Sequence, residues 1–391
     1  MAHRRRYPSE ARQKPGPLRC AVLAPAAAPY REPLFTALAA REDLGLRVLY
    51  QAQRLSGWDV DEGWFPAHHG YHARVLPALQ WARTGRGPVM LPRGLGRALD
   101  AFTPDVVAVW EFGPAALLAR AWCSRHRRAL VHFSELGAAA ARAVPAPQRT
   151  VHGVLAHRAA GAIGARTQAR DRLLTLGADP SRTVVSLQSV DTDPIRAAVA
   201  ARPSRSAERP LQLLCVARLV KDKNLAVLIE ATASAGSGTA ELDLVGDGPL
   251  RAELESQAAA SAAVVRFHGA VSPTRTAQAY ANADALALVS RHEPFGVALR
   301  EGAAAGLPLI ASARAGATGD VAVAGRNAIV VSPDDRVAIA AAVRALASDS
   351  ARRAAMANAS REIDAEWPLQ RSVEAFARVL LLAGGRRHGR A

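Results

Sequence analysis

The stretch DALALVSRHEPFGVALREGAAAGLPLIAS, residues 284–312, contains the unit from which the fold is built. Apolar runs at 284–290 and 307–313 predict two strands, and a helix is expected between them, beginning near Phe295 or Gly296. Apolar runs without alternating polar residues are typical of strands covered on both faces. The stretch therefore predicts a strand, a helix and a second, parallel strand.

The same alternation continues on both sides of this stretch. It stops once, in the proline-, arginine- and serine-rich segment 189–210, and then restarts. Two successive halves of this kind predict an α/β protein in which two Rossmann-like domains face a central cleft. The predicted strands are 18–24, 44–52, 104–111, 129–135, 161–167 and 183–188 in the first half, and 211–217, 241–246, 264–269, 284–290, 307–313 and 327–333 in the second.

The domain boundaries follow from these breaks. We expect a mobile basic tail at 1–17, an N-terminal domain at 18–190 and a linker at 191–210. A C-terminal domain at 211–365 and a final helical segment with a tail at 366–391 complete the chain. The length of 391 residues suits two domains rather than one.

The composition indicates a globular protein with a strongly basic surface. Half of the residues are apolar, and the net charge is +16. Only Lys14, Lys221 and Lys223 are lysines, so arginine supplies nearly all of the positive charge. One interpretation is a general arginine bias from base composition; the others are an anionic ligand, peripheral contact with an anionic membrane, or nucleic acid.

The cysteines and the apolar runs indicate in which cellular compartment the protein is expected. Three cysteines lie far apart without a C-x-x-C pair, which fits a reducing environment. No apolar run is long enough to span a bilayer, and prolines interrupt the one after Arg4 to Arg6, so a signal peptide is not expected. We expect a cytoplasmic protein, with possible attachment to the inner face of the membrane left open.

Two glutamates flank the predicted helix start in the segment 290–312. Glu293 lies in the loop before the helix, and Glu301 lies about two turns into it. The unpaired N–H groups at a helix N-terminus can hold a phosphate, and Gly296 lets a ligand approach the backbone closely. The two carboxylates cannot share one helix face, so they are expected to contact two ends of one extended ligand.

A second cluster, VARLVKDKN at 216–224, places Arg218 and Lys223 just after a strand. Open α/β sheets bind ligands at this carboxyl edge. Two cations there suit a diphosphate and can neutralise the charge on a leaving phosphate without a metal ion. The alternative interpretation is a solvated, charged turn.

A third element, LVGDGPL at 244–250, has the glycines of a tight turn near a ligand. The dinucleotide fingerprint needs a third glycine where Arg251 stands, which disfavours a nicotinamide oxidoreductase.

Residues 211–335 resemble the donor-binding domain of the retaining family 4 glycosyltransferases (glycosyl transferases group 1), which have the GT-B fold. Residues 157–195 and 28–41 are similar to parts of the N-terminal domain of that family. The helix after Trp367 resembles its C-terminal segment that crosses back to the first domain. The matching pieces of the donor domain are ARLVKDKN, GDGP, VRFHGAV, EPFGVALRE, EGAAAGLPLIAS and GRNAIVVSPDD.

The resemblance implies an enzyme that transfers a sugar from a nucleotide-sugar, by default a UDP-sugar, to a hydroxyl acceptor. The acceptor would be a surface polysaccharide, a glycolipid or a natural-product intermediate, bound by the N-terminal domain. It also implies a front-face mechanism that retains the anomeric configuration and uses no metal or other cofactor. Arg218 and Lys223 would hold the diphosphate, and Glu293 and Glu301 the sugar and the ribose. The implied catalytic and donor-binding residues are Arg218, Lys223, Gly246, His268, Gly269, Glu293, Phe295, Gly296, Val297 and Glu301.

The N-terminal half departs from the family pattern. The loop APAAAPYRE at 24–32 lacks the glycines that many members carry, and Tyr30 and Arg31 are candidates to take their place. Many members have a histidine after a middle strand, where this chain offers His132 or Glu135. Strand alternation places these two on opposite faces, and we favour Glu135 at the strand end, with His132 alternatively a core residue.

Neither acidic triplets nor histidines form a convincing metal site. Asp59 with Asp61 and Asp191 with Asp193 form D-x-D triplets, but the first is not preceded by a convincing strand and the second lies at the start of the linker. His68, His69 and His72 lack the spacing of a zinc site. No metal is therefore expected.

The segment 57–83 concentrates aromatic residues, including Trp58, Trp64 and Trp81. Such rings can stack on an acceptor or rest at a membrane interface, but we favour packing beneath a long loop.

Three alternatives to a transferase remain. A nucleotide-sugar epimerase and a phosphorylase-like enzyme share the two-domain layout, although a phosphorylase would need a cofactor-bearing lysine outside the phosphate loop. A basic nucleic-acid-binding protein would explain the charge. However, the arginines are spread along the chain and no nucleic-acid-reading motif is present, so no nucleic-acid partner is expected.

Overall fold

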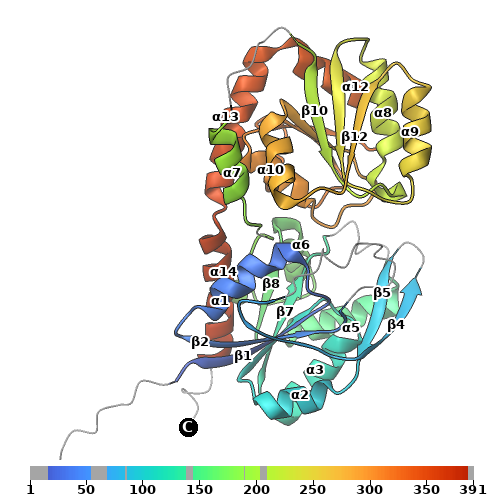
Figure 1. Ribbon diagram of the computed structural model, residues 1–391. Helices are drawn as coiled ribbons and strands as arrows, with labels where there is room; N and C mark the ends of the chain where they lie inside the picture. The colour runs from blue at the N-terminus through green and yellow to red at the C-terminus, as the bar shows by residue number, and fades with distance from the viewer. Residues whose placement is uncertain are drawn as a thin grey trace, which may run out of the picture.

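The computed structural model describes residues 16–53, 68–83, 86–137, 144–188, 190–202 and 209–385. Figure 1 shows two α/β domains stacked one above the other, with helices α13 and α14 running along one side of both. Each domain has a parallel sheet between helices, so the predicted fold class is confirmed. Most of the predicted tail lies outside the described residues.

The first sheet has seven parallel strands in the order β3-β2-β1-β6-β7-β8-β9. Its central strands are covered on both faces, which explains their unbroken apolar sequences. The strands are β1 (Leu18–Ala24), β2 (Leu44–Tyr50), β3 (His72–Val75), β6 (Val106–Trp110), β7 (Ala129–Ser134), β8 (Gly161–Gly164) and β9 (Thr183–Val185).

The second sheet has six parallel strands in the order β12-β11-β10-β13-β14-β15. The order reverses beside β10, between β11 on one side and β13 on the other, which is where sheets of this type bind ligands. The strands are β10 (Leu211–Val216), β11 (Ala240–Val245), β12 (Val264–Gly269), β13 (Ala285–Leu288), β14 (Leu309–Ser312) and β15 (Ala328–Val331).

The helices connect these strands and cover both sheets. Their ends follow local chemistry; for example, the side chain of Ser272 caps α10, and Asp335 caps α12. The helices are η1 (Pro29–Arg31), α1 (Glu32–Ala39), α2 (Leu95–Phe102), α3 (Pro114–Arg125), α5 (Ala146–His157), α6 (Thr167–Thr175), η3 (Pro180–Arg182), α7 (Asp193–Ala200), η4 (Lys221–Lys223), α8 (Leu225–Ser234), α9 (Arg251–Ala259), α10 (Pro273–Asn282), α11 (Val297–Ala304), α12 (Arg336–Ser348), α13 (Ser350–Glu366) and α14 (Leu369–Gly384).

Helix α14 belongs to the core of the first domain although it comes last in the chain. Phe376 is fully buried there, with its ring centroid 5.9 Å from that of Phe133 on β7. Ser372 donates to the carbonyl of Leu187, just after β9, over 2.9 Å. The final helix thus completes the hydrophobic core of the N-terminal domain.

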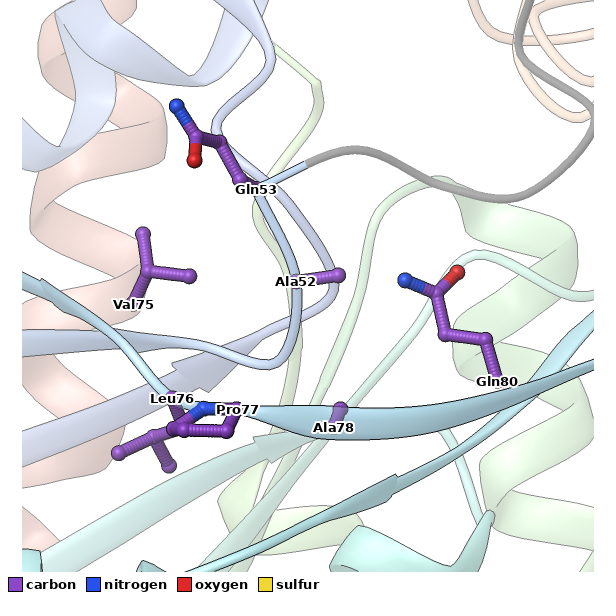
Figure 2. A pocket seen from close by; sticks show the side chains of 7 residues that line it. All are labelled: Ala52, Gln53, Val75, Leu76, Pro77, Ala78 and Gln80. Atoms are coloured by element: carbon purple, nitrogen blue, oxygen red, sulfur yellow. The ribbon is translucent and has the colours of Figure 1, made fainter.

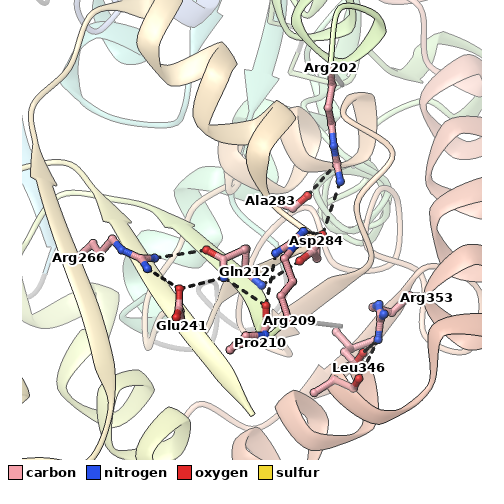
Figure 3. Close-up of polar contacts among 11 residues, drawn as sticks. Arg202, Arg209, Pro210, Gln212, Glu241, Arg266, Ala283, Asp284, Leu346 and Arg353 are labelled. Atoms are coloured by element: carbon pink, nitrogen blue, oxygen red, sulfur yellow. Dashed lines mark hydrogen bonds and ion pairs between the residues drawn. The ribbon is translucent and has the colours of Figure 1, made fainter. Parts of the chain in front are cut away.

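The segment treated as a linker contains a helix. Helix α7 occupies 193–200, and Ile195 on it is buried against the second domain. After it, Arg209 donates to Asp284 over 2.8 Å, and the other carboxylate oxygen of Asp284 accepts from the backbone of Gln212 (Figure 3). These contacts fix the entry of the chain into β10.

The two domains meet where the carboxyl edges of their sheets face each other. Thr167, the first residue of α6, donates its backbone N–H to Asp320 of the second domain over 2.9 Å, and its hydroxyl also bonds that carboxylate. We call this region the seam and define it by Tyr30, Arg166, Thr167, Glu293, Gly316 and Asp320. No helix within the described ranges is long and apolar enough to cross a membrane.

Candidate active site

The loop after β10 carries the two predicted phosphate-binding cations. Asn224 closes it in a left-handed conformation, and its side chain donates to the carbonyls of Val289 and Pro333 over 3.2 and 2.7 Å. The backbone of Asp222 accepts the N–H of Arg291 over 2.8 Å. The loop is therefore fastened to the segment that follows β13, where Glu293 lies.

This fastening joins Lys223 to Glu293. The ammonium of Lys223 forms an ion pair with Oε2 of Glu293, and the two side chains are only 16% and 10% exposed. The side chain of Arg218 makes no hydrogen bond or ion pair with any residue in the described ranges, so its guanidinium remains available. The structure thus places all three predicted catalytic residues in loops at the carboxyl edge of the second sheet, with Lys223 and Glu293 in direct contact.

The glycines of LVGDGPL serve the packing of two loops. Gly246 has φ of +135°, and a Cβ there would lie 2.0 Å from the carbonyl oxygen of Ala217. A Cβ on Gly248 would likewise lie 2.6 Å from the carbonyl oxygen of Leu219. These glycines let the turn lie directly on the backbone that carries Arg218, so Gly246 supports the site through that backbone.

The helix behind Glu293 begins as predicted. Gly296 has φ of +96° and precedes α11, which starts at Val297. Phe295 is 3% exposed, and its carbonyl accepts the N–H of Ala317 over 2.6 Å. The backbone N–H groups at the start of α11 therefore form a rigid, positively polarised end next to the Lys223–Glu293 pair.

Glu301 has a partner that the sequence analysis missed. Its Oε2 accepts the hydroxyl of Tyr280, from α10, over 2.6 Å. Burial raises the pKa of Glu301, and the Tyr280 bond partly opposes this shift. Tyr280 occupies a core position on its helix, and nothing in the sequence distinguishes it from an ordinary core aromatic residue.

His268 pairs its side chain with a carboxylate on the neighbouring strand. Its Nε2 lies 2.6 Å from Asp243 Oδ1 on the neighbouring strand β11, and the ring is 42% exposed. Gly269 follows at the end of β12 with φ of +70°. Any contribution of residue 268 to donor binding is therefore left to its backbone.

Three of the four candidates from the N-terminal domain lie together at the seam. Arg31 donates to Glu135 Oε1 over 2.9 Å, and Trp110 Nε1 donates to the same oxygen over 3.0 Å. Burial raises the pKa of Tyr30, and the negative charges of Glu135 and of Glu293 act on it in the same direction. Tyr30 thus lies within electrostatic reach of both domains.

The structure contradicts the predicted acceptor-side role of the fourth candidate, His132. Its side chain is fully buried and stacks on Phe112 with ring centroids 4.6 Å apart, and neither ring nitrogen hydrogen-bonds to a residue that the structure describes. Burial lowers the pKa of His132 to about 3. It is a neutral core residue, and the idea that it contacts the acceptor was wrong.

A second carboxylate, Glu111, supports Glu135 and was not foreseen. It follows β6 in a left-handed conformation with φ of +54°. Its carboxylate accepts the backbone N–H of Glu135 over 2.6 Å and the hydroxyl of Ser134 over 3.0 Å. A non-glycine residue with positive φ is uncommon, and only the backbone coordinates reveal it.

A separate pocket lies at the outer edge of the first sheet, beside the hairpin of β4 (Ala78–Arg83) and β5 (Arg86–Pro92). Figure 2 shows its polar side chains, Gln53 and Gln80, and its apolar wall. Trp81 on the hairpin is 49% exposed, so the expected burial of the aromatic segment was wrong for this residue. Trp58, Trp64, Asp59 and Asp61 lie outside the described residues, while Asp193 pairs with Arg196.

Comparisons with known proteins bear on the family and on the fold. Residues 199–363 match the family described as glycosyl transferases group 1. Glycogen synthase of Mycobacterium tuberculosis is 29% identical over 72% of this chain and 70% of its own. A D-inositol 3-phosphate glycosyltransferase of Xylanimonas cellulosilytica is 30% identical over 63% of each chain. The fold matches Anabaena HepE in complex with UDP-glucose, with a TM-score of 0.70, 18% identity, and coverage of 93% of this chain and 99% of that one.

Proposed function

We propose a specific reaction for this chain, which is a group 1 glycosyltransferase with the GT-B fold: it transfers a sugar from a UDP-sugar to a hydroxyl acceptor and retains the anomeric configuration. The Lys223–Glu293 pair before the start of α11 carries the proposal, together with Arg218 in the same loop as Lys223. The HepE structure with UDP-glucose supports the choice of nucleotide. A growing polysaccharide, a glycolipid or a natural-product intermediate is the acceptor class.

The proposed mechanism assigns roles to residues of both domains. Arg218, Lys223 and the first N–H groups of α11 neutralise the diphosphate as it leaves. Glu293 binds hydroxyls of the donor sugar, and Glu301 binds the ribose. The leaving phosphate takes the proton of the acceptor hydroxyl on the same face, so the reaction needs neither an enzyme nucleophile nor a metal ion. Tyr30, Arg31 and Glu135 line the acceptor side.

Substitution of Arg218 by glutamine tests the reaction. We expect UDP affinity to fall about tenfold or more, because a charge-assisted bond to phosphate is lost, and sugar transfer to fall further. Stability should change by less than ~0.5 kcal/mol, since the side chain makes no bond with described residues. Arg336→Gln is the matched control, an exposed arginine paired with Glu230. Unchanged UDP binding and turnover in Arg218→Gln would contradict the assignment.

We also propose that the basic surface brings the protein to the anionic inner face of a membrane, where lipid-linked acceptors reside. The exposed side chains of Val75, Leu79 and Trp81, on β3 and β4, support such contact. Flotation with liposomes that contain or lack anionic lipid measures it.

A further inference from the structure

We propose that Arg166 is an anion-binding residue at the seam, which recognises a carboxylate or phosphate on the substrate in addition to the donor diphosphate. The inference rests on the proposed function and narrows its substrate class to acidic sugars or acidic acceptors. It starts from a side chain that no motif in the sequence singled out.

Arg166 is buried without a counter-ion. It is 7% exposed, and its Nε donates to the backbone carbonyl of Glu135 over 3.0 Å. Within the described ranges, its two terminal nitrogens form no hydrogen bond, and no carboxylate there lies within 4.0 Å to form an ion pair.

Burying an unpaired guanidinium lowers the free energy of unfolding, and the surrounding charges do not fully offset this loss. Burial lowers the pKa of Arg166, while Glu135, Asp320 and Glu111 act more weakly in the opposite direction. Glu135 already pairs with Arg31, and Asp320 is bonded to Thr167. Arg172, also buried, is bonded to Ser134 and His152 and adds another positive charge. Three guanidinium groups, those of Arg31, Arg166 and Arg172, thus lie near three partly buried carboxylates, Glu111, Glu135 and Asp320, and two of these carboxylates already have partners of their own.

The location of Arg166 indicates which part of a substrate it would meet. A Cβ on Gly316 would lie 2.5 Å from Arg166 Nη1, and one on Gly137 would lie 3.1 Å from Nη2. Gly316 donates its N–H to the carbonyl of Glu293 over 3.0 Å. The guanidinium thus reaches from the N-terminal domain to the loop assigned to the donor sugar, whereas Arg218 and Lys223 serve the diphosphate. An oxyanion on the transferred sugar or on the acceptor fits this position.

The test measures binding by calorimetry with the full-length chain. One arm compares UDP-glucuronate with UDP-glucose, and the other compares an inositol monophosphate with myo-inositol in the presence of UDP. We expect the acidic member of at least one pair to bind about tenfold tighter or more, because the new bond is charge-assisted. Arg166→Gln should abolish this preference, and Arg166→Lys should keep part of it. Arg170→Gln, which changes an exposed arginine paired with Asp171 on the same helix, should leave it intact.

The outcomes separate the two proposals. Absence of UDP binding by the unmodified chain would overturn the proposed donor and, with it, this inference. UDP binding without preference for either acid, or a preference that survives in Arg166→Gln, would overturn the inference alone. Thermal unfolding gives a second readout: Arg166→Gln should melt at the same or a higher temperature without ligand, because an uncompensated charge is removed. A clearly lower melting temperature of Arg166→Gln would show instead that the Arg166 side chain stabilises the fold.

Discussion

At the scale of single residues, the site depends on charges that are paired before a ligand arrives. Lys223 and Glu293 neutralise each other while largely buried, which avoids the cost of two isolated ions. In the proposed mechanism the diphosphate draws the ammonium toward itself, and Glu293 becomes free to accept hydrogen bonds from sugar hydroxyls. The same pair thus keeps the empty site stable and couples phosphate binding to sugar binding.

Glu301→Gln tests the ribose assignment and the effect of burial together. Burial raises the pKa of Glu301 above its ordinary value of 4.5 in the folded state, so the charged form destabilises the fold at neutral pH. The penalty is full above the folded pKa and disappears as pH falls through it toward 4.5. We expect Glu301→Gln to raise the melting temperature at pH 7 relative to the unmodified chain, and to raise it less at pH 4.

The same variant should weaken UDP binding several-fold, since an amide accepts hydrogen bonds from the ribose less strongly than a carboxylate. Binding of 2′,3′-dideoxy-UDP, which lacks those hydroxyls, should change little. Equal losses for both nucleotides, measured by calorimetry, would remove Glu301 from the ribose. Tyr280→Phe is the companion variant, because it keeps the carboxylate and deletes only the hydroxyl bonded to it.

At the scale of elements, the carboxyl edge of the second sheet is built by loops that lie directly on one another. The turn after β11 packs its glycines on the loop after β10, and that loop is fastened by Asn224 to the ends of β13 and β15. The position of Arg218 is therefore set by the two neighbouring loops.

Gly246→Ala should damage this arrangement. The new Cβ would lie 2.0 Å from the Ala217 carbonyl oxygen, and the backbone φ of +135° is unfavourable for alanine. We expect a loss of about 2–4 kcal/mol of stability and weaker UDP binding, because both strain and displacement act on the Arg218 loop. Gly238→Ala is the control: its φ is also positive, at +70°, but no atom lies within 4 Å. It should cost only ~1 kcal/mol and leave UDP binding unchanged; similar losses of UDP affinity in both variants would show that loop packing does not matter.

The elements differ in how far the sequence could predict them. Central strands such as β1, at 18–24, are continuous apolar runs, and their predicted bounds match the structure. Strand β3 was missed because it is a four-residue strand at the sheet edge with mostly exposed side chains. Helix α7 was missed because a proline and arginines surround its one fully buried side chain, Ile195.

The site shows the same division. Arg218, Lys223, Glu293 and Glu301 belong to local motifs, so they could be proposed as candidates from their spacing along the chain alone. Tyr280, Glu111 and Arg166 act through partners that are distant in sequence, and their burial is set by tertiary packing. His132 was misplaced because alternation along a strand indicates a face of the sheet but does not indicate what covers that face.

At the scale of the whole molecule, the chain links its two domains at both ends of the seam. Helix α14 returns from the second domain to complete the core of the first, as Figure 1 shows. Arg300 on α11 forms an ion pair with Asp364 on α13 over 2.9 Å, with both side chains nearly buried. The helix that carries Glu301 is therefore tied to the segment that leads back to the N-terminal domain, so a movement between the domains would be transmitted to the surroundings of Glu301.

Asp320 makes polar contacts between the two domains at the seam, and Asp320→Ala tests their role. Its carboxylate caps α6 of the other domain through the N–H and hydroxyl of Thr167. Removing the carboxylate leaves the N-terminus of α6 without its cap, so we expect the free energy of unfolding to fall by about 1 kcal/mol. We also expect a larger radius of gyration in solution without ligand. UDP-glucose should restore part of the compact form if it bridges the domains. Asp334→Ala is the control, since Asp334 pairs with Arg291 and Arg314 within one domain. If small-angle scattering gives the same radius for Asp320→Ala and the unmodified chain, Asp320 caps a helix without setting the distance between the domains.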